Sequence, residues 1–132
     1  MALPSGALAA YRSVQADHLP RVRWPAAALG GVLTYLGQAQ RAMAQRDVPA
    51  AHEALVQSQQ ILALLRGGLD RGAAPELVDQ LDAVYAFVQQ GVGRANLHKD
   101  PEALHSVIPV VATLREAWEA AAERELAGGG RP

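Results

Sequence analysis

Cysteine is absent from the 132 residues, which excludes a disulfide, a thiolate metal ligand and a cysteine nucleophile. Two of the β-branched residues and the aromatic residues are scarce: Thr and Ile occur twice each, and Trp, Tyr and Phe together make 5%. Strands are rich in such residues, so their scarcity argues against a β-sandwich or barrel. The formal net charge is only −1. Without a long basic run, this balance argues against nucleic acid or an anionic membrane as the main partner.

Long apolar runs are lacking as well. The longest uncharged stretch, residues 24–40, contains Pro25 and three glycines. Its apolar part is shorter than the roughly 20 residues that a membrane-spanning helix needs. Residues 1–6 carry no charged side chain and include Pro4, a pattern that differs from a signal peptide. We therefore expect no membrane insertion and a cytoplasmic location.

Helix-forming residues are abundant, since 27 Ala and 17 Leu make up one third of the chain. Apolar residues recur at three- and four-residue steps, which is the pattern of one helix face. Pro within the first turn and a preceding Asp are typical helix starts. Four helices with short connections predict an all-α fold, an antiparallel four-helix bundle. The four segments are 25–46, 49–69, 75–96 and 101–125.

The domain organisation follows from the same patterns. Residues 1–20 are predicted to form a flexible N-terminal arm, 21–126 the helical bundle and 127–132 a disordered tail. Pro109 lies inside the last helical segment and predicts a kink or a restart there. The expected core residues occupy the inward stripes, and they are Leu33, Leu36, Leu55, Leu62, Leu65, Leu81, Val88, Leu114 and Trp118.

The four histidines are the most reactive side chains of the chain. In phosphotransfer bundles a Lys typically follows the phosphorylated His by three positions, and none of these histidines has that Lys. A di-iron bundle needs two Glu-x-x-His pairs, and only Glu102 with His105 fits. The first-turn position of Glu102 is explained by the helix dipole. With no Gly-rich phosphate loop and no serine elbow, we expect no enzyme activity, no cofactor and no metal site.

Apolar residues are more numerous in segments 49–69 and 75–96 than one inward stripe needs. Two interpretations of this excess are open. A bundle helix that contacts two neighbours has a wide apolar stripe. Alternatively, part of the excess forms a groove that accepts a partner's amphipathic helix.

Several short motifs follow one another in a characteristic order. They are Gly31-Val-Leu33; Ala42-Met43 with Asp47; Ile61-Leu-Ala-Leu-Leu65 with Leu69-Asp70; Leu81, Tyr85 and Phe87; Ala95-Asn96 with Asp100; and Leu114-Arg-Glu-Ala117-Trp118. Tyr11 precedes the first helix. In this order, over about two thirds of its length, the chain resembles the flagellin-specific export chaperone family, FliS. It departs from that family at Ala28-Leu29-Gly30-Gly31, where a Leu-Tyr-Asp-Gly segment is usual.

The resemblance implies a chaperone without catalysis. Such a chaperone would bind the disordered C-terminal segment of flagellin, prevent premature polymerisation and keep it competent for flagellar type III secretion. The resemblance leaves room for export-gate components and for a homodimer as further partners. The alternative is a helical-bundle adaptor, or a chaperone for a different secreted client.

Client-binding residues are expected along apolar strips of the first three helices. Ile61 and Leu64 are expected to be solvent-accessible in the free chain, and the arm around Tyr11 to cover part of the surface. The full set is Tyr11, Leu29, Val32, Tyr35, Ile61, Leu64, Tyr85 and Phe87.

Overall fold

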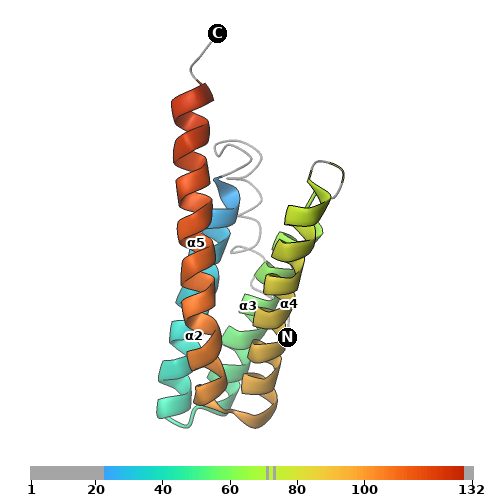
Figure 1. Cartoon of the computed structure of the whole chain (residues 1–132). Coiled ribbons are helices and arrows are strands. Elements are labelled where there is room, and N and C mark those ends of the chain that lie inside the picture. Colours follow the sequence, from blue (N-terminus) through green and yellow to red (C-terminus); the bar gives the residue numbers. More distant parts are fainter. Residues whose placement is uncertain (1–22, 71, 73, 130–132) are drawn as a thin grey trace.

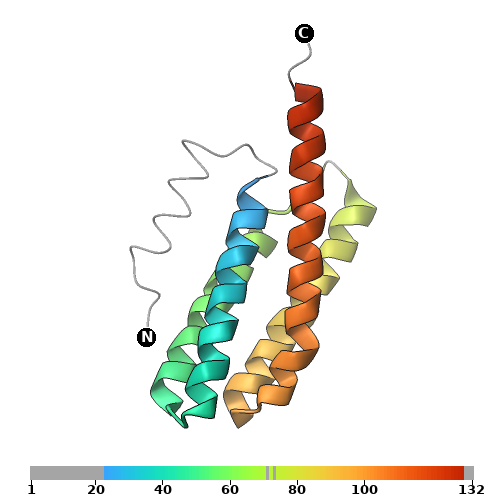
Figure 2. The ribbon, with the colours of Figure 1, turned by 90° about the vertical axis from the view of Figure 1, so that its left-hand side faces the viewer.

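The bundle consists of four helices that run alternately up and down (Figures 1 and 2). A computed structural model describes residues 23–70, 72 and 74–129, with side chains as far as Arg124. Helices α2 and α4 each pack against both α3 and α5, so the four form a closed ring. This confirms the predicted all-α bundle. The helices are α2 (Trp24–Ala44), α3 (Val48–Gly67), α4 (Pro75–His98) and α5 (Pro101–Gly129).

All four helices begin with an early proline, and α3 and α5 also have the expected aspartate cap, whereas α2 and α4 have no side-chain cap. Proline stands within the first two positions of each helix, where a missing N–H costs little. The Asp47 side chain accepts a hydrogen bond from the Ala50 N–H at 3.2 Å. Asp100 accepts one from the Glu102 N–H at 3.0 Å. Both aspartates thus satisfy backbone donors that the first helical turn leaves without partners.

The helix ends differ from the predicted ones by a few residues. Helix α2 ends at Ala44 rather than 46, α3 ends at Gly67 rather than 69, and α4 continues to His98. Helix α5 continues to Gly129, beyond position 127 where the tail was expected to begin. The predicted arm and residues 130–132 lie outside the described residues.

Pro109 does not cause a restart, because α5 is continuous across it. Proline removes the donor for the carbonyl of residue 105. Both Pro109 and His105 are exposed, so water can solvate the carbonyl that loses its helical partner. The solvent-facing position of the proline explains why the helix tolerates it.

Among the described residues, none of the helices has the length and hydropathy that crossing a membrane requires.

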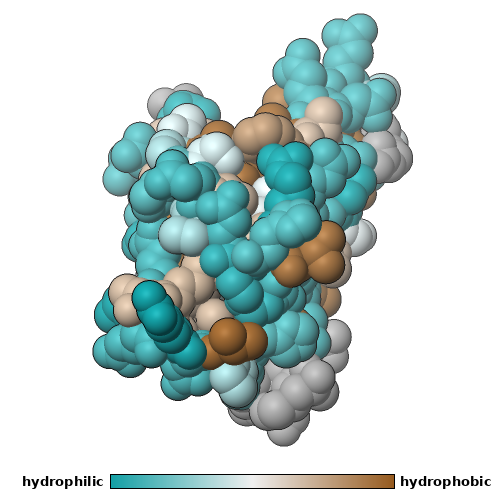
Figure 3. Space-filling model, turned by 90° about the horizontal axis from the view of Figure 1, so that it is seen from below, coloured by the Kyte–Doolittle hydropathy of each residue, from teal (hydrophilic) through white to brown (hydrophobic). Residues whose placement is uncertain are grey.

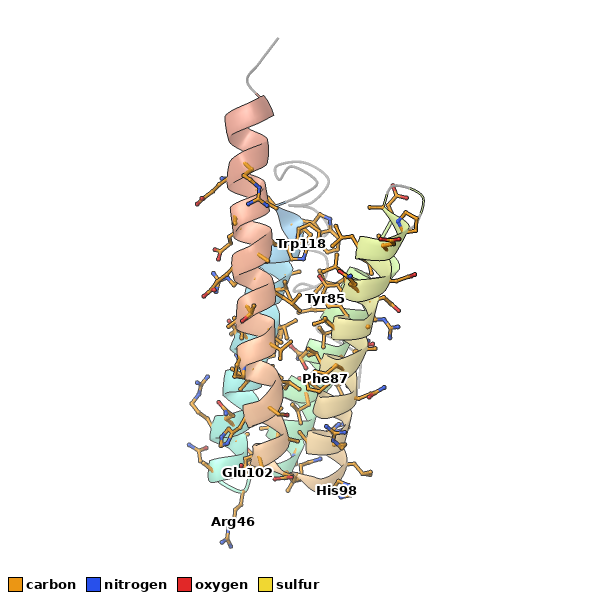
Figure 4. The ribbon with its side chains drawn as sticks, in the orientation of Figure 1. Arg46, Tyr85, Phe87, His98, Glu102 and Trp118 are labelled. Carbon is orange, nitrogen blue, oxygen red and sulfur yellow. The ribbon has the colours of Figure 1, made fainter. Side chains whose placement is uncertain are left out.

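The core lies along the centre of the ring and is built from aliphatic side chains around Tyr85. Of the predicted core residues, Leu33, Leu81 and Trp118 are only half-buried and pack against its edge. Leu33 lies at the margin of its stripe. Leu81 and Trp118 share a helix face with buried residues, since they lie four positions before Tyr85 and Ala122, and both lie toward the upper end of the bundle, where α4 begins (Figures 1 and 4). The predicted core residues that are buried are Leu36, Leu55, Leu62, Leu65, Val88 and Leu114.

Gly91 sets the closest approach between α4 and α5. A Cβ atom at this position would lie 2.3 Å from Cγ1 of Val107, which is far inside van der Waals contact. We expect Gly91→Ala to lower the free energy of unfolding by about 1–3 kcal/mol, as overpacking does. Urea denaturation followed by circular dichroism measures this change.

Gly93 supplies the matched control on the same helix. A Cβ atom there would meet only the Gln59 amide at 3.8 Å, and Gly93 is exposed. We expect Gly93→Ala to raise the free energy of unfolding by about 0.5–1 kcal/mol through helix propensity. A Gly91→Ala variant as stable as Gly93→Ala would contradict the close packing of α4 on α5.

Candidate functional site

Four of the predicted client-binding residues lie inside the bundle. Leu29, Val32 and Tyr85 are 0% exposed and Ile61 is 1% exposed. They meet in one continuous core. The expectation that Ile61 is solvent-accessible in the free chain is therefore wrong. The physical reason is the width of the α3 stripe, which reaches two neighbouring helices, as the first of the two interpretations proposed. A client could touch these four side chains only if the bundle opened.

Tyr85 and Trp118 join α4 to α5 near the upper end of the bundle. The Trp118 indole N–H donates a hydrogen bond to the Tyr85 hydroxyl at 3.0 Å, and the two side chains point toward one another (Figure 4). Burial raises the pKa of Tyr85, while the hydrogen bond from Trp118 opposes that rise. Trp118 is half-buried. This pair is a structural junction whose outer edge is open to solvent.

The accessible members of the predicted set lie on three different helices. Tyr35 on α2 and Leu64 on α3 are half-buried, and Phe87 on α4 is 43% exposed. Tyr11 lies outside the described residues. Tyr35 lines a hollow between α2 and α5, and neither Leu64 nor Phe87 is among the residues that line it. An extended segment that wraps around the bundle could contact all three.

A hollow of about 410 Å³ lies between α2 and α5. Tyr35 is at its wall, together with the exposed Arg115 from α5. The Arg115 guanidinium covers Gly30, since a Cβ atom there would be 3.5 Å from its Cζ atom. Arg115 otherwise makes one long ion pair, with Glu119 at 3.8 Å. The lining residues are Ala27, Gly30, Gly31, Thr34, Tyr35, Gln38 and Arg115.

This hollow continues toward the beginning of α2. A second hollow of about 280 Å³ shares Ala27 with the first. It adds Arg23 and the acidic side chains of Glu119 and Glu123. We call the two hollows, which adjoin at Ala27, the α2–α5 groove; Arg115 lies in the wall of the first hollow, and the second has both a cation and carboxylates in its wall. Sequence reasoning singled out Gly30 and Gly31 here but missed Arg115, which lies 85 residues away in the chain.

The face between α3 and α4 is held by polar contacts. Arg66 makes a two-pronged ion pair with Asp82, at 2.7 and 2.9 Å, and donates to Gln89 Oε1 at 2.7 Å. The hydrogen bond to Asp82 raises the pKa of Arg66. Gln59 donates to the Gln89 carbonyl at 2.8 Å. Because these groups already satisfy one another, this face has little to offer an apolar client.

Side chains that could support metal chemistry do not converge. Among the described residues, no group of three or more His, Asp or Glu side chains is arranged to hold a metal ion. Glu102 and His105 are 3.6 Å apart on an exposed turn of α5. Their exposure and their spacing fit a local surface pair.

Comparison with known proteins decides the family. The family model described as "Flagellar protein FliS" matches residues 5–125. This chain belongs to the FliS family. It is 28% identical over 118 residues to the flagellar secretion chaperone FliS of Vibrio cholerae, and the matched region covers 86% of this chain and 87% of that protein. It is 30% identical over 90 residues to the FliS of Salmonella typhimurium, covering 67% of each chain. FliS is a family of export chaperones and not of enzymes.

Proposed function

We propose that this FliS-family chain is a cytoplasmic chaperone that binds the disordered C-terminal segment of flagellin. In this role it prevents premature polymerisation and keeps flagellin competent for flagellar type III secretion. The observation that carries the proposal is the family match over residues 5–125, together with relatives named flagellar secretion chaperones. Export-gate components and a second copy of the chain are further proposed partners.

The surface of the bundle supports a client that wraps around it. Tyr35, Leu64 and Phe87 offer apolar contacts on three successive helices. A disordered client exposes apolar stretches that would otherwise associate with one another. Covering these stretches on a rigid bundle gains hydrophobic free energy, while the cost of ordering the client keeps its release feasible. The segment around Tyr11 is proposed to occupy part of this surface until a client displaces it.

A different secreted client is the alternative, and the Gly30–Arg115 contact favours it. The guanidinium lies over Gly30, where a Cβ atom would be 3.5 Å from its Cζ atom, and it places a cation in the wall of the α2–α5 hollow. A client that carries a carboxylate opposite Arg115 would fit this surface. Titration of the chain with a flagellin C-terminal segment separates the two proposals, because a chaperone for another client would not bind it.

Leu64→Asp and Phe87→Asp test where the client binds. Burying one large apolar side chain contributes about 1.5–3 kcal/mol. We therefore expect each variant to weaken binding of the flagellin segment by at least about tenfold. The variants should keep their helical circular dichroism, because both side chains are accessible in the free chain. Isothermal titration calorimetry measures the dissociation constants.

Leu97→Asp is the control for these two variants. Leu97 is 78% exposed and lies at the end of α4 that is far from the α3–α4 connection. The substitution introduces the same negative charge as the other two variants. It should bind the segment like the unaltered chain. Equal weakening by all three variants would show a general charge effect. Normal binding by folded Leu64→Asp and Phe87→Asp would place the client elsewhere, with the α2–α5 groove as the next surface to vary.

A further inference from the structure

The lower end of the bundle, formed by residues 45–47 and 99–100, carries a hollow that the client proposal does not use. We call it the turn end. The hollow is about 300 Å³ and its walls are mainly apolar, from Met43, Val48 and Ala51. Val48 is 53% exposed and Leu97, on the same end, is 78% exposed. Seen end-on, apolar patches interrupt an otherwise hydrophilic surface (Figure 3).

Two cations flank this hollow. Arg46 and Lys99 both line it, and both have positive φ angles, 57° and 50°. Lys99 is held in place, because its ammonium donates to Asn96 Oδ1 at 2.6 Å. Arg46 is exposed and points away from the bundle (Figure 4). The ion pairs among the described residues do not include it.

The acidic groups nearby are already engaged. Asp47 caps α3 through the Ala50 N–H, and Asp100 caps α5 through the Glu102 N–H. Helix N-termini compensate negative charge at these positions. Glu102 lies beside His105, with 3.6 Å between Oε2 and Nδ1. Three charged side chains line the hollow, namely Arg46, Asp47 and Lys99, so cations outnumber carboxylates in its wall, and Arg46 is the cation that the ion pairs of the described residues leave for a partner.

We propose that the turn end is a docking surface for a partner segment that presents a bulky apolar side chain beside a carboxylate. The apolar side chain enters the hollow between Met43, Val48 and Ala51. The carboxylate pairs with Arg46 at the rim, and Lys99 adds positive potential from the other side. Charge complementarity selects this occupant over a neutral apolar segment, since the Arg46 guanidinium binds a carboxylate more strongly than the carbonyl oxygen of an amide.

The turn end is separate from the proposed client residues. Leu64 lies 16 residues beyond Val48 on α3, which is about 24 Å along the helix axis. Tyr35 lies nine residues before Ala44, the last residue of α2, which is about 13 Å along that helix axis. A client along the sides of the bundle leaves this end free, so one chaperone molecule could hold two partners.

The chemistry is tested with two blocked dipeptides that differ only in charge, acetyl-Phe-Glu-amide and acetyl-Phe-Gln-amide. Each is titrated into the full chain at low ionic strength while amide signals are followed by ¹H–¹⁵N NMR. We expect both peptides to shift the amide signals of Val48, Ala51 and Lys99, and the acidic peptide to bind about fivefold tighter. Salt should reduce that preference. Equal affinities, or shifts scattered over the whole surface, would overturn the proposal.

Two variants separate the contributions. Arg46→Gly suits a positive φ, so it should fold normally while losing most of the preference for the acidic peptide. Val48→Glu places an acid on an exposed first-turn position and should abolish binding of both peptides. Leu77→Glu, at a residue 56% exposed on α4, is the matched control and should bind like the unaltered chain. Unchanged peptide binding by Val48→Glu would overturn the proposal. Raising the protein concentration without peptide is the second check: if that alone shifts the same amide signals, a second copy of the chain is the occupant and the proposal is overturned.

Discussion

Ile61→Asp is expected to unfold the chain. The Ile61 side chain is 1% exposed and belongs to the core. An unpaired carboxylate buried among aliphatic groups costs several kcal/mol, and the lost isoleucine removes a further 1.5–3 kcal/mol or so of burial. Together these costs approach the roughly 5–15 kcal/mol by which a typical domain is stable. Circular dichroism at 25 °C should show loss of helix, or urea denaturation a stability lower by about 5 kcal/mol or more.

Leu64→Asp is the internal comparison for this prediction. Leu64 lies three positions later on α3 and is half-buried. Water reaches its position, so a carboxylate there stays solvated and we expect a stability loss of about 1 kcal/mol, the centre of the range for single substitutions. Similar melting temperatures for Ile61→Asp and the unaltered chain would contradict the burial of Ile61. They would favour the open groove that the apolar excess of α3 also allows.

Helix positions could be predicted from the sequence because their signals are local. Apolar spacing identifies one face of a helix within a few turns, and Pro with a preceding Asp marks the start. Asp47 and Asp100 each act within three residues of their own position. The helix ends were less certain, since they depend on where the next connection begins. Pro109 shows the same limit, because its effect depended on whether its helix face meets solvent or a neighbour.

The division between core and surface could be predicted only in part. Ile61 and Leu64 lie on the same side of α3 and have similar hydrophobicity. Their different burial depends on how α2 and α4 lie across α3, which the periodicity of α3 does not contain. Leu81 and Trp118 are half-buried although they lie four positions before Tyr85 and Ala122, which are buried on the same helix faces. Stripe width alone therefore could not separate a core residue from an accessible one.

Contacts between distant residues could not be predicted at all. Arg66 and Asp82 meet across α3 and α4, and Arg115 covers Gly30 from another helix. Each pairing depends on the rotation of two helices about their own axes. The turn end has the same origin, since it brings Met43 and Val48 beside Lys99. The resemblance of the motifs identified the family but carried no information about these side-chain contacts.

Leu62→Ala is expected to lower the free energy of unfolding by about 2–5 kcal/mol, through lost burial and the cavity that remains. Leu62 is 0% exposed at the centre of the α3 stripe. Leu62→Met keeps the volume and should cost less than about 1.5 kcal/mol. Urea denaturation with an unchanged m-value would show that the loss arises in the folded state.

Leu62→Ala can also be tested for client binding. Leu62 has no accessible surface to offer a partner, so the folded fraction of Leu62→Ala should bind a flagellin segment with normal affinity. Leu64→Asp should show the reverse, with small loss of stability and large loss of binding. A stability cost below about 1 kcal/mol for Leu62→Ala would contradict its place in a packed core, since deleting a buried leucine side chain costs more than that. The opposite behaviour of two residues two positions apart would separate the structural stripe of α3 from its binding surface.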